Sequence, residues 1–201
     1  MQRRVWEGIA KSWDRHRQEP EKPVLDFTKD KKFLLDLGCG SGRNFFKGKK
    51  YIGVDFSIEM LKLARQNAKK KGAKALLMRA DLAALPLKDD SFENVLLVAT
   101  LHVMEGRKRR LCLREMKHVM KKNAHALITV WNKEHPRFIG TKKVVFVPWK
   151  VGNKRYMRYY YLFEKDELKE LLNEYFEVQY IESQKRLKQY DENIIAVVKK
   201  L

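Results

Sequence analysis

Residues 34–44 read LLDLGCGSGRN, and this stretch decides the fold. An apolar run leads directly into a loop with glycine at positions 38, 40 and 42. This arrangement is typical of the first strand and turn of a doubly wound α/β sheet. A dinucleotide-binding loop would carry its third glycine at position 43, where this chain has Arg43. The loop therefore indicates a ligand site at the end of the strand but argues against NAD.

The segments that follow this loop alternate between strand and helix. YIGVDFS (51–57) predicts a second strand, and residues 58–72 predict an amphipathic helix that stops at Gly72. Apolar runs predict three more strands, over residues 74–81, 94–102 and 125–132, with a basic helix over residues 107–122. We therefore expect a mainly parallel sheet with helices on both faces.

The end of the chain is predicted to complete the sheet. Residues 165–175 have a strong helical pattern. Two strands follow, over residues 176–184 and 193–201, joined by a polar segment around Lys188 to Glu192. We expect these two strands to form an antiparallel pair.

The composition indicates one folded domain with a strong positive charge. Its 201 residues are 44% hydrophobic, and 44 lysines and arginines against 25 acids give a net charge of +19. Such a surplus suggests a polyanionic partner, either nucleic acid or an anionic membrane surface. No run approaches the roughly 18 apolar residues of a spanning helix, and the opening MQRRVWEGIAKSWDRHRQEP has no signal-peptide core. We expect a cytoplasmic protein with no membrane partner and, with only Cys39 and Cys112 as cysteines, no metal site.

Two segments lie outside the strand–helix alternation. Residues 1–30 are polar and basic and contain a short helical pattern, which predicts an N-terminal lid or docking segment. Residues 132–163 are rich in basic and aromatic side chains without a clear helix, and we expect them to form a substrate loop over the site. Both belong to a single predicted domain, residues 1–201.

Aspartates at the ends of three successive strands predict the cofactor. Asp36 can hold a positive group beside the glycine loop, and Asp55 can bind both hydroxyls of a ribose. Asp81 can accept from an adenine amino group, and S-adenosylmethionine (SAM) offers an ammonium, a ribose and an adenine. A single strand-end aspartate is often only a loop cap, but three in series favour a ligand. The residues expected to bind SAM are Asp36, Gly38, Cys39, Gly40, Asp55, Phe56, Asp81, Leu82 and Ala99.

Several ordered motifs resemble those of class I SAM-dependent methyltransferases. They are LLDLGCGSGRN, YIGVDFS, RADLAALPLKDDSFENVLLV and HALITVW, which cover about half the chain. This resemblance implies a Rossmann-like, seven-stranded sheet whose last strand is antiparallel.

Four further stretches resemble the tRNA methyltransferases that esterify a carboxymethyl group on the wobble uridine. They are VWEGIAKSWDRHRQEP, VATLHVMEGRKRRLCLREM, VFVPW and RYYYLFEKDEL. The resemblance implies conversion of 5-carboxymethyluridine to its methyl ester (cm5U to mcm5U). The alternatives are methylation of another RNA site or of a small metabolite or quinone, and a non-catalytic RNA scaffold that binds SAM.

The expected chemistry needs positioning more than proton transfer. A carboxylate is already ionised at neutral pH, so its attack on a methyl group needs a cation to orient it and no general base. The resemblance places the site arginine of the family at Arg17, whose fork suits a carboxylate; a phosphate-binding or solvated arginine is the alternative. His102 matches the first of two adjacent histidines in the family, and Val103 replaces the second. Arg17 and His102 are therefore the predicted catalytic residues, with a structural role as the alternative for His102.

Basic and aromatic side chains predict an interface for the tRNA anticodon loop. Aromatic rings can stack on splayed bases, and lysines and arginines can meet phosphates. A solvated surface or core packing would explain each of them as well. The expected RNA-binding residues are Arg109, Arg110, Lys142, Lys143, Trp149, Arg158 and Tyr159.

The resemblance also implies a small zinc-binding activator subunit that pairs with the edge of the sheet. The third strand is that edge, and it carries apolar residues on both faces, at Ala75, Leu76, Leu77 and Met78. An uncovered edge of this kind invites aggregation, which favours a partner. A neighbouring loop of the same chain could cover it instead.

Overall fold

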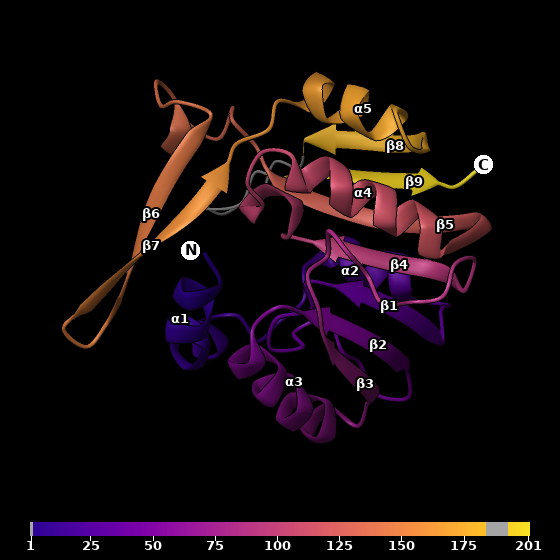
Figure 1. Cartoon of the computed structure of the whole chain (residues 1–201), viewed down its shortest axis with the longest axis horizontal. Helices are drawn as coiled ribbons and strands as arrows, with labels where there is room; N and C mark the ends of the chain where they lie inside the picture. Colours follow the sequence, from indigo (N-terminus) through magenta and orange to yellow (C-terminus); the bar gives the residue numbers. More distant parts are fainter. Residues whose placement is uncertain (1, 184–192) are drawn as a thin grey trace.

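Seven strands form one sheet in the order β3-β2-β1-β4-β5-β9-β8, with the helices around it (Figure 1). The structure is a computed structural model that describes residues 2–183 and 193–201. The strands are β1 (Phe33–Leu37), β2 (Lys50–Asp55), β3 (Lys74–Arg79), β4 (Phe92–Val98), β5 (Met120–Trp131), β8 (Glu177–Ser183) and β9 (Asn193–Lys199).

The first five strands of the sheet are parallel to their neighbours, and β9 is antiparallel. It lies between β5 and β8 and pairs antiparallel with both. The predicted fold class, a mainly parallel seven-stranded sheet with an antiparallel last strand, is confirmed. The polar segment predicted to join the last two strands, around Lys188 to Glu192, lies outside the described residues.

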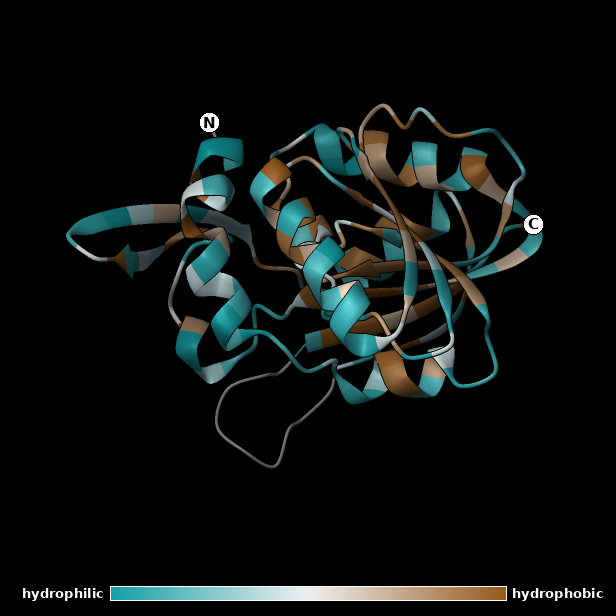
Figure 2. Ribbon diagram, turned by 90° about the horizontal axis from the view of Figure 1, so that it is seen from below, coloured by the Kyte–Doolittle hydropathy of each residue, from teal (hydrophilic) through white to brown (hydrophobic). Residues whose placement is uncertain are grey.

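Helices cover both faces of the sheet, as predicted. On one face, α4 (Lys108–Val119) and α5 (Lys165–Asn173) pack on the larger apolar core, and on the other α2 (Lys22–Thr28) and α3 (Ile58–Lys71) pack on a second core. Figure 2 shows hydrophobic residues gathered in the central strands and a mixture of hydrophilic and hydrophobic residues in the surrounding helices. Local signals set their ends: Ser57 accepts a hydrogen bond from the Met60 N–H at the start of α3, and Gly72 closes it with φ 67°.

The boundary between α4 and β5 differs from the expected one. The basic helix predicted to reach residue 122 ends at Val119, and Met120 already pairs with Phe92 of β4. Pairing with the neighbouring strand therefore takes over three residues earlier than the charge pattern of the segment indicates.

The expected loop over residues 132–163 contains a β-hairpin. The short helix η2 (Pro136–Phe138) leads to β6 (Val144–Val151), which pairs antiparallel with β7 (Lys154–Tyr161). The hairpin projects from the body of the molecule and lies against α1 (Gln2–His16), the predicted N-terminal helix (Figure 1). The sequence of β6 is almost entirely apolar and that of β7 mixes basic and aromatic residues, so neither shows the clear alternation that predicts a strand.

The outer edge of the sheet is β3, as the sequence suggested. Among the described residues it pairs only with β2, and 73% of Leu76 is exposed. None of the helices in the described ranges combines the length and apolar character needed to cross a membrane.

Candidate active site

The glycine loop after β1 forms the floor of the site. Gly38 has φ 76°, and its N–H donates to the Val54 carbonyl at 2.7 Å. A Cβ at this position would lie 2.3 Å from Oγ1 of Thr100, which follows β4. Only glycine therefore allows the loop to approach the end of β4 this closely.

Asp55 anchors the loop from the end of β2. Its Oδ2 accepts from the Gly40 N–H and its Oδ1 from the Ser57 N–H, both at 2.9 Å. Burial raises the pKa of Asp55 to about 6, although these backbone hydrogen bonds lower it. Each oxygen keeps a lone pair, so the carboxylate can still accept from two ribose hydroxyls.

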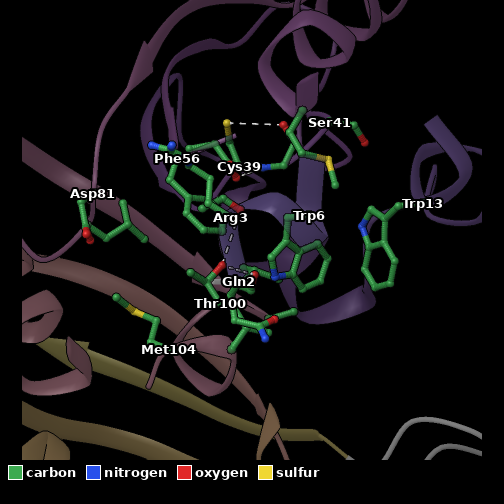
Figure 3. Close-up of a pocket in the computed structure, with 18 of the residues that line it drawn as sticks. Gln2, Arg3, Trp6, Trp13, Cys39, Ser41, Phe56, Asp81, Thr100 and Met104 are labelled. Atoms are coloured by element: carbon green, nitrogen blue, oxygen red, sulfur yellow. Dashed lines mark hydrogen bonds between the residues drawn. The ribbon is translucent and has the colours of Figure 1, made fainter. Parts of the chain in front are cut away.

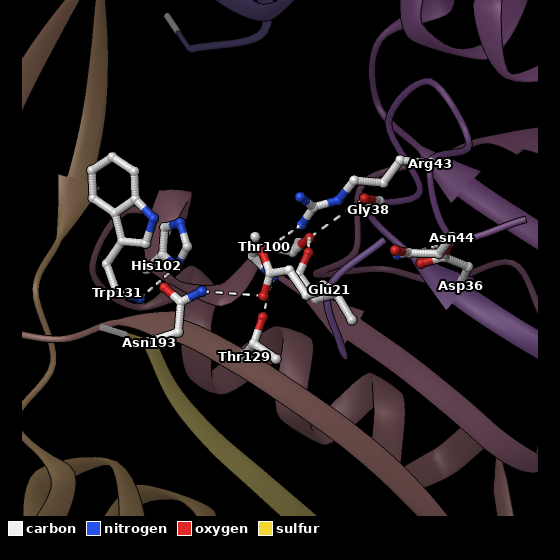
Figure 4. A network of polar contacts seen from close by, with 12 residues as sticks. Glu21, Asp36, Gly38, Arg43, Asn44, Thr100, His102, Thr129, Trp131 and Asn193 are labelled. Atoms are coloured by element: carbon white, nitrogen blue, oxygen red, sulfur yellow. Dashed lines mark hydrogen bonds and ion pairs between the residues drawn. The ribbon is translucent and has the colours of Figure 1, made fainter. Parts of the chain in front are cut away.

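Asp36 is a buried carboxylate with an unused hydrogen-bond acceptor among the described residues. It is fully buried, its Oδ1 has no hydrogen-bond partner, and its Oδ2 lies 3.5 Å from Asn44 Nδ2 (Figure 4). Burial raises its pKa to about 7, while Asn44 and the charge of Arg43 act in the opposite direction. The orphaned oxygen fits a ligand with a cationic group, such as the ammonium of SAM.

A cavity of about 910 Å³ lies at the carboxyl ends of β1, β2 and β4. Figure 3 shows Trp6 and Trp13 of α1 on one side of it and Phe56 and Asp81 on the other. Of the nine predicted cofactor residues, eight line this cavity: Gly38, Cys39, Gly40, Asp55, Phe56, Asp81, Leu82 and Ala99. Asp36 lies behind the wall, beside the lining residue Asn44.

Asp81 already has partners within the chain. Its Oδ1 accepts from the Ala83 N–H at 3.0 Å, and its Oδ2 pairs with Nζ of Lys108 at 2.6 Å. Burial acts to raise the pKa of Asp81, but these two donors outweigh it and the pKa is lowered. The predicted contact with an adenine amino group would have to share these oxygens.

Ala99 has an unusual backbone at the cavity wall. Its φ is +52°, a left-handed conformation that is costly for a residue with a Cβ. The Ala99 N–H donates to both the carbonyl and Oγ1 of Thr129, at 3.0 and 2.9 Å, which fixes it in this shape. Strain of this kind is common at ligand sites and is consistent with the predicted role of Ala99.

His102 lies behind the cavity and does not line it. It is 1% exposed, and its Nδ1 accepts from the Trp131 N–H at 3.1 Å. Burial first, and then the charges of Arg43 and Arg158, lower its pKa to about 3. The ring is therefore neutral with its proton on Nε2, and it stacks 5.4 Å from the ring of Trp131. This environment suits a positioning residue, and a direct catalytic role stays a prediction.

Arg17 does lie on the cavity wall, at the end of α1. Its guanidinium carbon lies 5.3 Å from the Trp13 ring centre. No carboxylate within residues 2–183 or 193–201 pairs with this guanidinium. Arg17 is therefore available to an anion that enters the cavity.

The structure places the predicted RNA-binding residues in four different environments. Arg110 pairs with Glu174 at 2.6 Å, and Lys143 pairs with Glu164 and Glu167. Arg109 lies half-buried, 4.0 Å above the Tyr161 ring. Arg158 and Tyr159 are buried and Trp149 is half-buried against α1, which leaves Lys142 exposed. Core packing thus accounts for several of these side chains.

A polar network that the sequence did not reveal joins the linker before α2 to the glycine loop. Glu21 pairs with Arg43 at 3.2 Å and accepts from Asn193 Nδ2 at 3.2 Å (Figure 4). Arg43 also lines the cavity. In the sequence, only Arg43, at the position of the missing third glycine, hinted at this network. Nothing in the sequence connects Arg43 to residues 21 or 193.

The chain is similar to known methyltransferases. The chain matches a family model described as a methyltransferase domain over residues 34–123. A protein from Encephalitozoon cuniculi described as a methyltransferase is 32% identical over 146 residues, which cover 69% of this chain and 66% of that protein. The tRNA (carboxymethyluridine(34)-5-O)-methyltransferase of Saccharomyces cerevisiae is 28% identical over 160 residues, covering 73% of this chain and 55% of that protein.

A solved structure shows the same fold along the whole chain. It is a Haloferax volcanii methyltransferase in complex with the Trm112 methyltransferase activator, with a TM-score of 0.70 and 18% identity. The match covers 98% of this chain and 97% of that chain. Among the first five curated relatives, the matching region spans only 29% to 66% of each relative's length.

The strand order, the glycine loop and the strand-end aspartates define a class I methyltransferase fold with a SAM site. Residues 34–123 match a methyltransferase domain, and the relatives of the chain include named tRNA methyltransferases. The predictions of the fold class and of SAM as the cofactor are thereby confirmed.

Proposed function

We propose that the protein methylates the carboxymethyl group at position 5 of a tRNA wobble uridine, converting cm5U to mcm5U. The observation that carries this proposal is Arg17, a guanidinium on the wall of the cofactor cavity without a carboxylate partner in the described part of the chain. A carboxylate acceptor is the substrate group that this cation fits best. The similarity to the yeast carboxymethyluridine methyltransferase supports the same acceptor.

The residues around the cavity suit a reaction that requires no base. SAM, when bound, would supply a methyl group on a positively charged sulfur. Asp55 would hold the ribose, and the charge of Asp36, behind the wall, would attract the ammonium. His102 is neutral and lies behind the wall, so it is not placed to take a proton from the acceptor. An acceptor that is already ionised needs no base, and Arg17 would fix its carboxylate in line with the methyl group.

The positive charge supports an RNA substrate. The net charge is +19, and several exposed basic residues lie on or beside the hairpin. They are Lys142, Lys150, Lys154 and Arg155. Contacts between such residues and phosphates would hold the anticodon loop against the hairpin. The expected cytoplasmic location remains a prediction.

Transfer of a labelled methyl group tests the proposal. Labelled SAM is incubated with tRNA that carries carboxymethyluridine, and the product is treated with mild alkali. Label on the anticodon loop that alkali releases is the expected result, because an ester hydrolyses. Alkali-stable label would mean base or ribose methylation, and label on metabolites alone would mean a small-molecule enzyme. SAM binding without any transfer would favour the scaffold.

We also propose that β3 is the docking edge for a small zinc-binding activator subunit. Its outer side has no strand partner in the described ranges, and Leu76 presents an apolar side chain there. The fold shared with the Haloferax volcanii methyltransferase, solved with an activator, supports this partner. Leu76→Glu is expected to abolish co-purification with a Trm112-type subunit, while Lys70→Glu on the exposed side of α3 leaves it intact. Equal co-purification of both variants would contradict the proposal.

A further inference from the structure

Arg158 is a buried arginine in the hairpin that lacks a counter-ion. It is 4% exposed, and its Nη1 donates to the Tyr160 hydroxyl at 2.7 Å. Its Nε is buried without any hydrogen-bond partner. Within residues 2–183 and 193–201, no aspartate or glutamate pairs with it. A buried cation with an unused donor indicates that an anion belongs to this place.

Three aromatic rings hold the guanidinium of Arg158 in one position. Its central carbon lies 4.7 Å from the Trp149 ring centre and 5.2 Å from those of Trp13 and Tyr160. Trp149 is itself fixed, because its Nε1–H donates to Ser12 Oγ at 3.1 Å. The group is thus preorganised, and an anion that binds it meets a donor already in place.

The surroundings of Arg158 are cationic. Burial lowers its pKa, and the charges of Arg17 and Arg137 lower it further. An arginine remains charged despite such effects. Tyr160 acts in the opposite direction on this pKa, and an anion bound beside Arg158 would reduce the repulsion further.

Arg158 is also connected to the cofactor cavity. Its neighbour Trp13 lines the cavity, and the guanidinium carbon of Arg17 lies 5.3 Å from the same ring. On its other side, Tyr160 stacks on Trp131 with ring centres 3.9 Å apart. Trp131 in turn bonds to His102 at the end of β4 (Figure 4). The base of the hairpin is therefore packed onto the strand ends that form the site.

We propose that Arg158 and Arg17 together form the subsite for the carboxylate of the methyl acceptor. Arg158 is the fixed half, held by the aromatic rings, and Arg17 on the cavity wall is the half that closes on the substrate. A backbone phosphate cannot easily reach a guanidinium that is 96% buried, whereas a carboxylate on a short side arm can enter between the rings. The inference rests on the proposed function and adds the residue that distinguishes a carboxylate from its uncharged analogues.

Competition binding tests this subsite. The full chain, alone and with a Trm112-type subunit, is assayed with tRNAs whose wobble uridine carries carboxymethyl, carbamoylmethyl or no substituent. We expect the unaltered protein to bind the carboxymethyl tRNA about 10- to 100-fold more tightly than the other two. This ratio is the contribution expected from one hydrogen bond to a charged group. Arg158→Met is expected to remove this preference while SAM affinity stays within about twofold. Arg65→Met, at an exposed position on α3, is the matched control and should keep it.

Other outcomes overturn the inference. Arg158→Met could instead weaken the binding of all three tRNAs equally and reduce the slope of log affinity against log salt concentration by about one. In that case Arg158 contacts a phosphate. If the variant keeps the preference, Arg158 is not part of the subsite even though the proposed function stands. If the unaltered protein has no preference and does not methylate cm5U, the proposed function itself fails.

Two further variants guard against a folding defect. Arg158→Lys keeps the charge but loses the fork, and it should reduce the preference without abolishing it. Tyr160→Phe keeps the stack on Trp131 and removes only the hydroxyl that accepts from Nη1, so a small loss of preference is expected. An unchanged preference in both variants would contradict the carboxylate subsite.

Discussion

Asp55 combines two tasks at a single residue, because it holds the glycine loop and faces the ligand. Asp55→Ala removes the acceptor for the Gly40 and Ser57 N–H groups, so we expect SAM binding to be lost in calorimetry. Asp30→Ala, at an exposed position, is the control and should bind normally. Unchanged affinity of the Asp55 variant would remove this residue from the cofactor site.

Asp36 makes stability depend on pH. Burial raises its pKa to about 7, whereas an unfolded aspartate ionises near 3.9. Between these values the folded state holds the proton more tightly, so the free energy of unfolding falls as the pH rises from about 4 to 7, by at most about 4 kcal/mol. Denaturant titrations at several pH values measure this fall in the ligand-free protein. Asp36→Asn should flatten the curve, and a curve as steep as that of the unaltered protein would assign the effect elsewhere.

Sequence reasoning at the residue scale predicted eight residues that line the cavity but not the contacts that support them. The aspartates at 36, 55 and 81 end apolar strands, and the ends of parallel strands meet at one edge, so their proximity follows from the pattern. Glu21 and Asn193 are 172 positions apart, and their contact depends on how β9 enters the sheet. For His102 the pattern showed a strand end, but burial and its hydrogen bond to Trp131 exist only in three dimensions.

At the scale of elements, α1 lines the cavity and the hairpin packs against this helix. A Cβ at Gly8 would lie 2.3 Å from the Tyr156 ring, so this ring of β7 packs directly against the backbone of α1. Gly8→Leu is expected to separate α1 from the hairpin and to weaken SAM affinity by about tenfold, because Trp6 and Trp13 line the cavity. Trypsin should then cleave α1 faster, while Asp30→Ala, at an exposed position outside α1, should not change the rate. Unaltered proteolysis of Gly8→Leu would show that the contact does not hold α1.

Helices and strands whose apolar residues recur at a regular spacing could be predicted from the sequence. Those in which polar and apolar residues follow no regular spacing could not. The amphipathic pattern and the Gly72 stop located α3 within one residue. In the hairpin, β6 is almost entirely apolar and β7 mixes basic and aromatic residues. The alternation of polar and apolar side chains that predicts a strand is therefore weak in both. Their structure comes from pairing with each other and from packing against α1.

On the scale of the whole molecule, the net charge of +19 predicts a strong salt dependence of tRNA binding. Neutralising phosphates releases counter-ions, so about six phosphate contacts would reduce the affinity about 1000-fold between 50 and 200 mM salt. Filter binding at several salt concentrations measures the slope, with SAM affinity as a reference that should change little. A flat response would disconnect the charge from RNA.

The position of β9 has a consequence for the order of assembly. Residues 193–199 lie between β5 and β8, although β8 precedes them in the chain. During synthesis, β8 and α5 emerge from the ribosome before the strand that must connect them to the rest of the sheet. Until residues 193–199 have been synthesised, the edge of β5 that pairs with β9 stays uncovered in the nascent protein. A chaperone would recognise the exposed apolar surface at that stage.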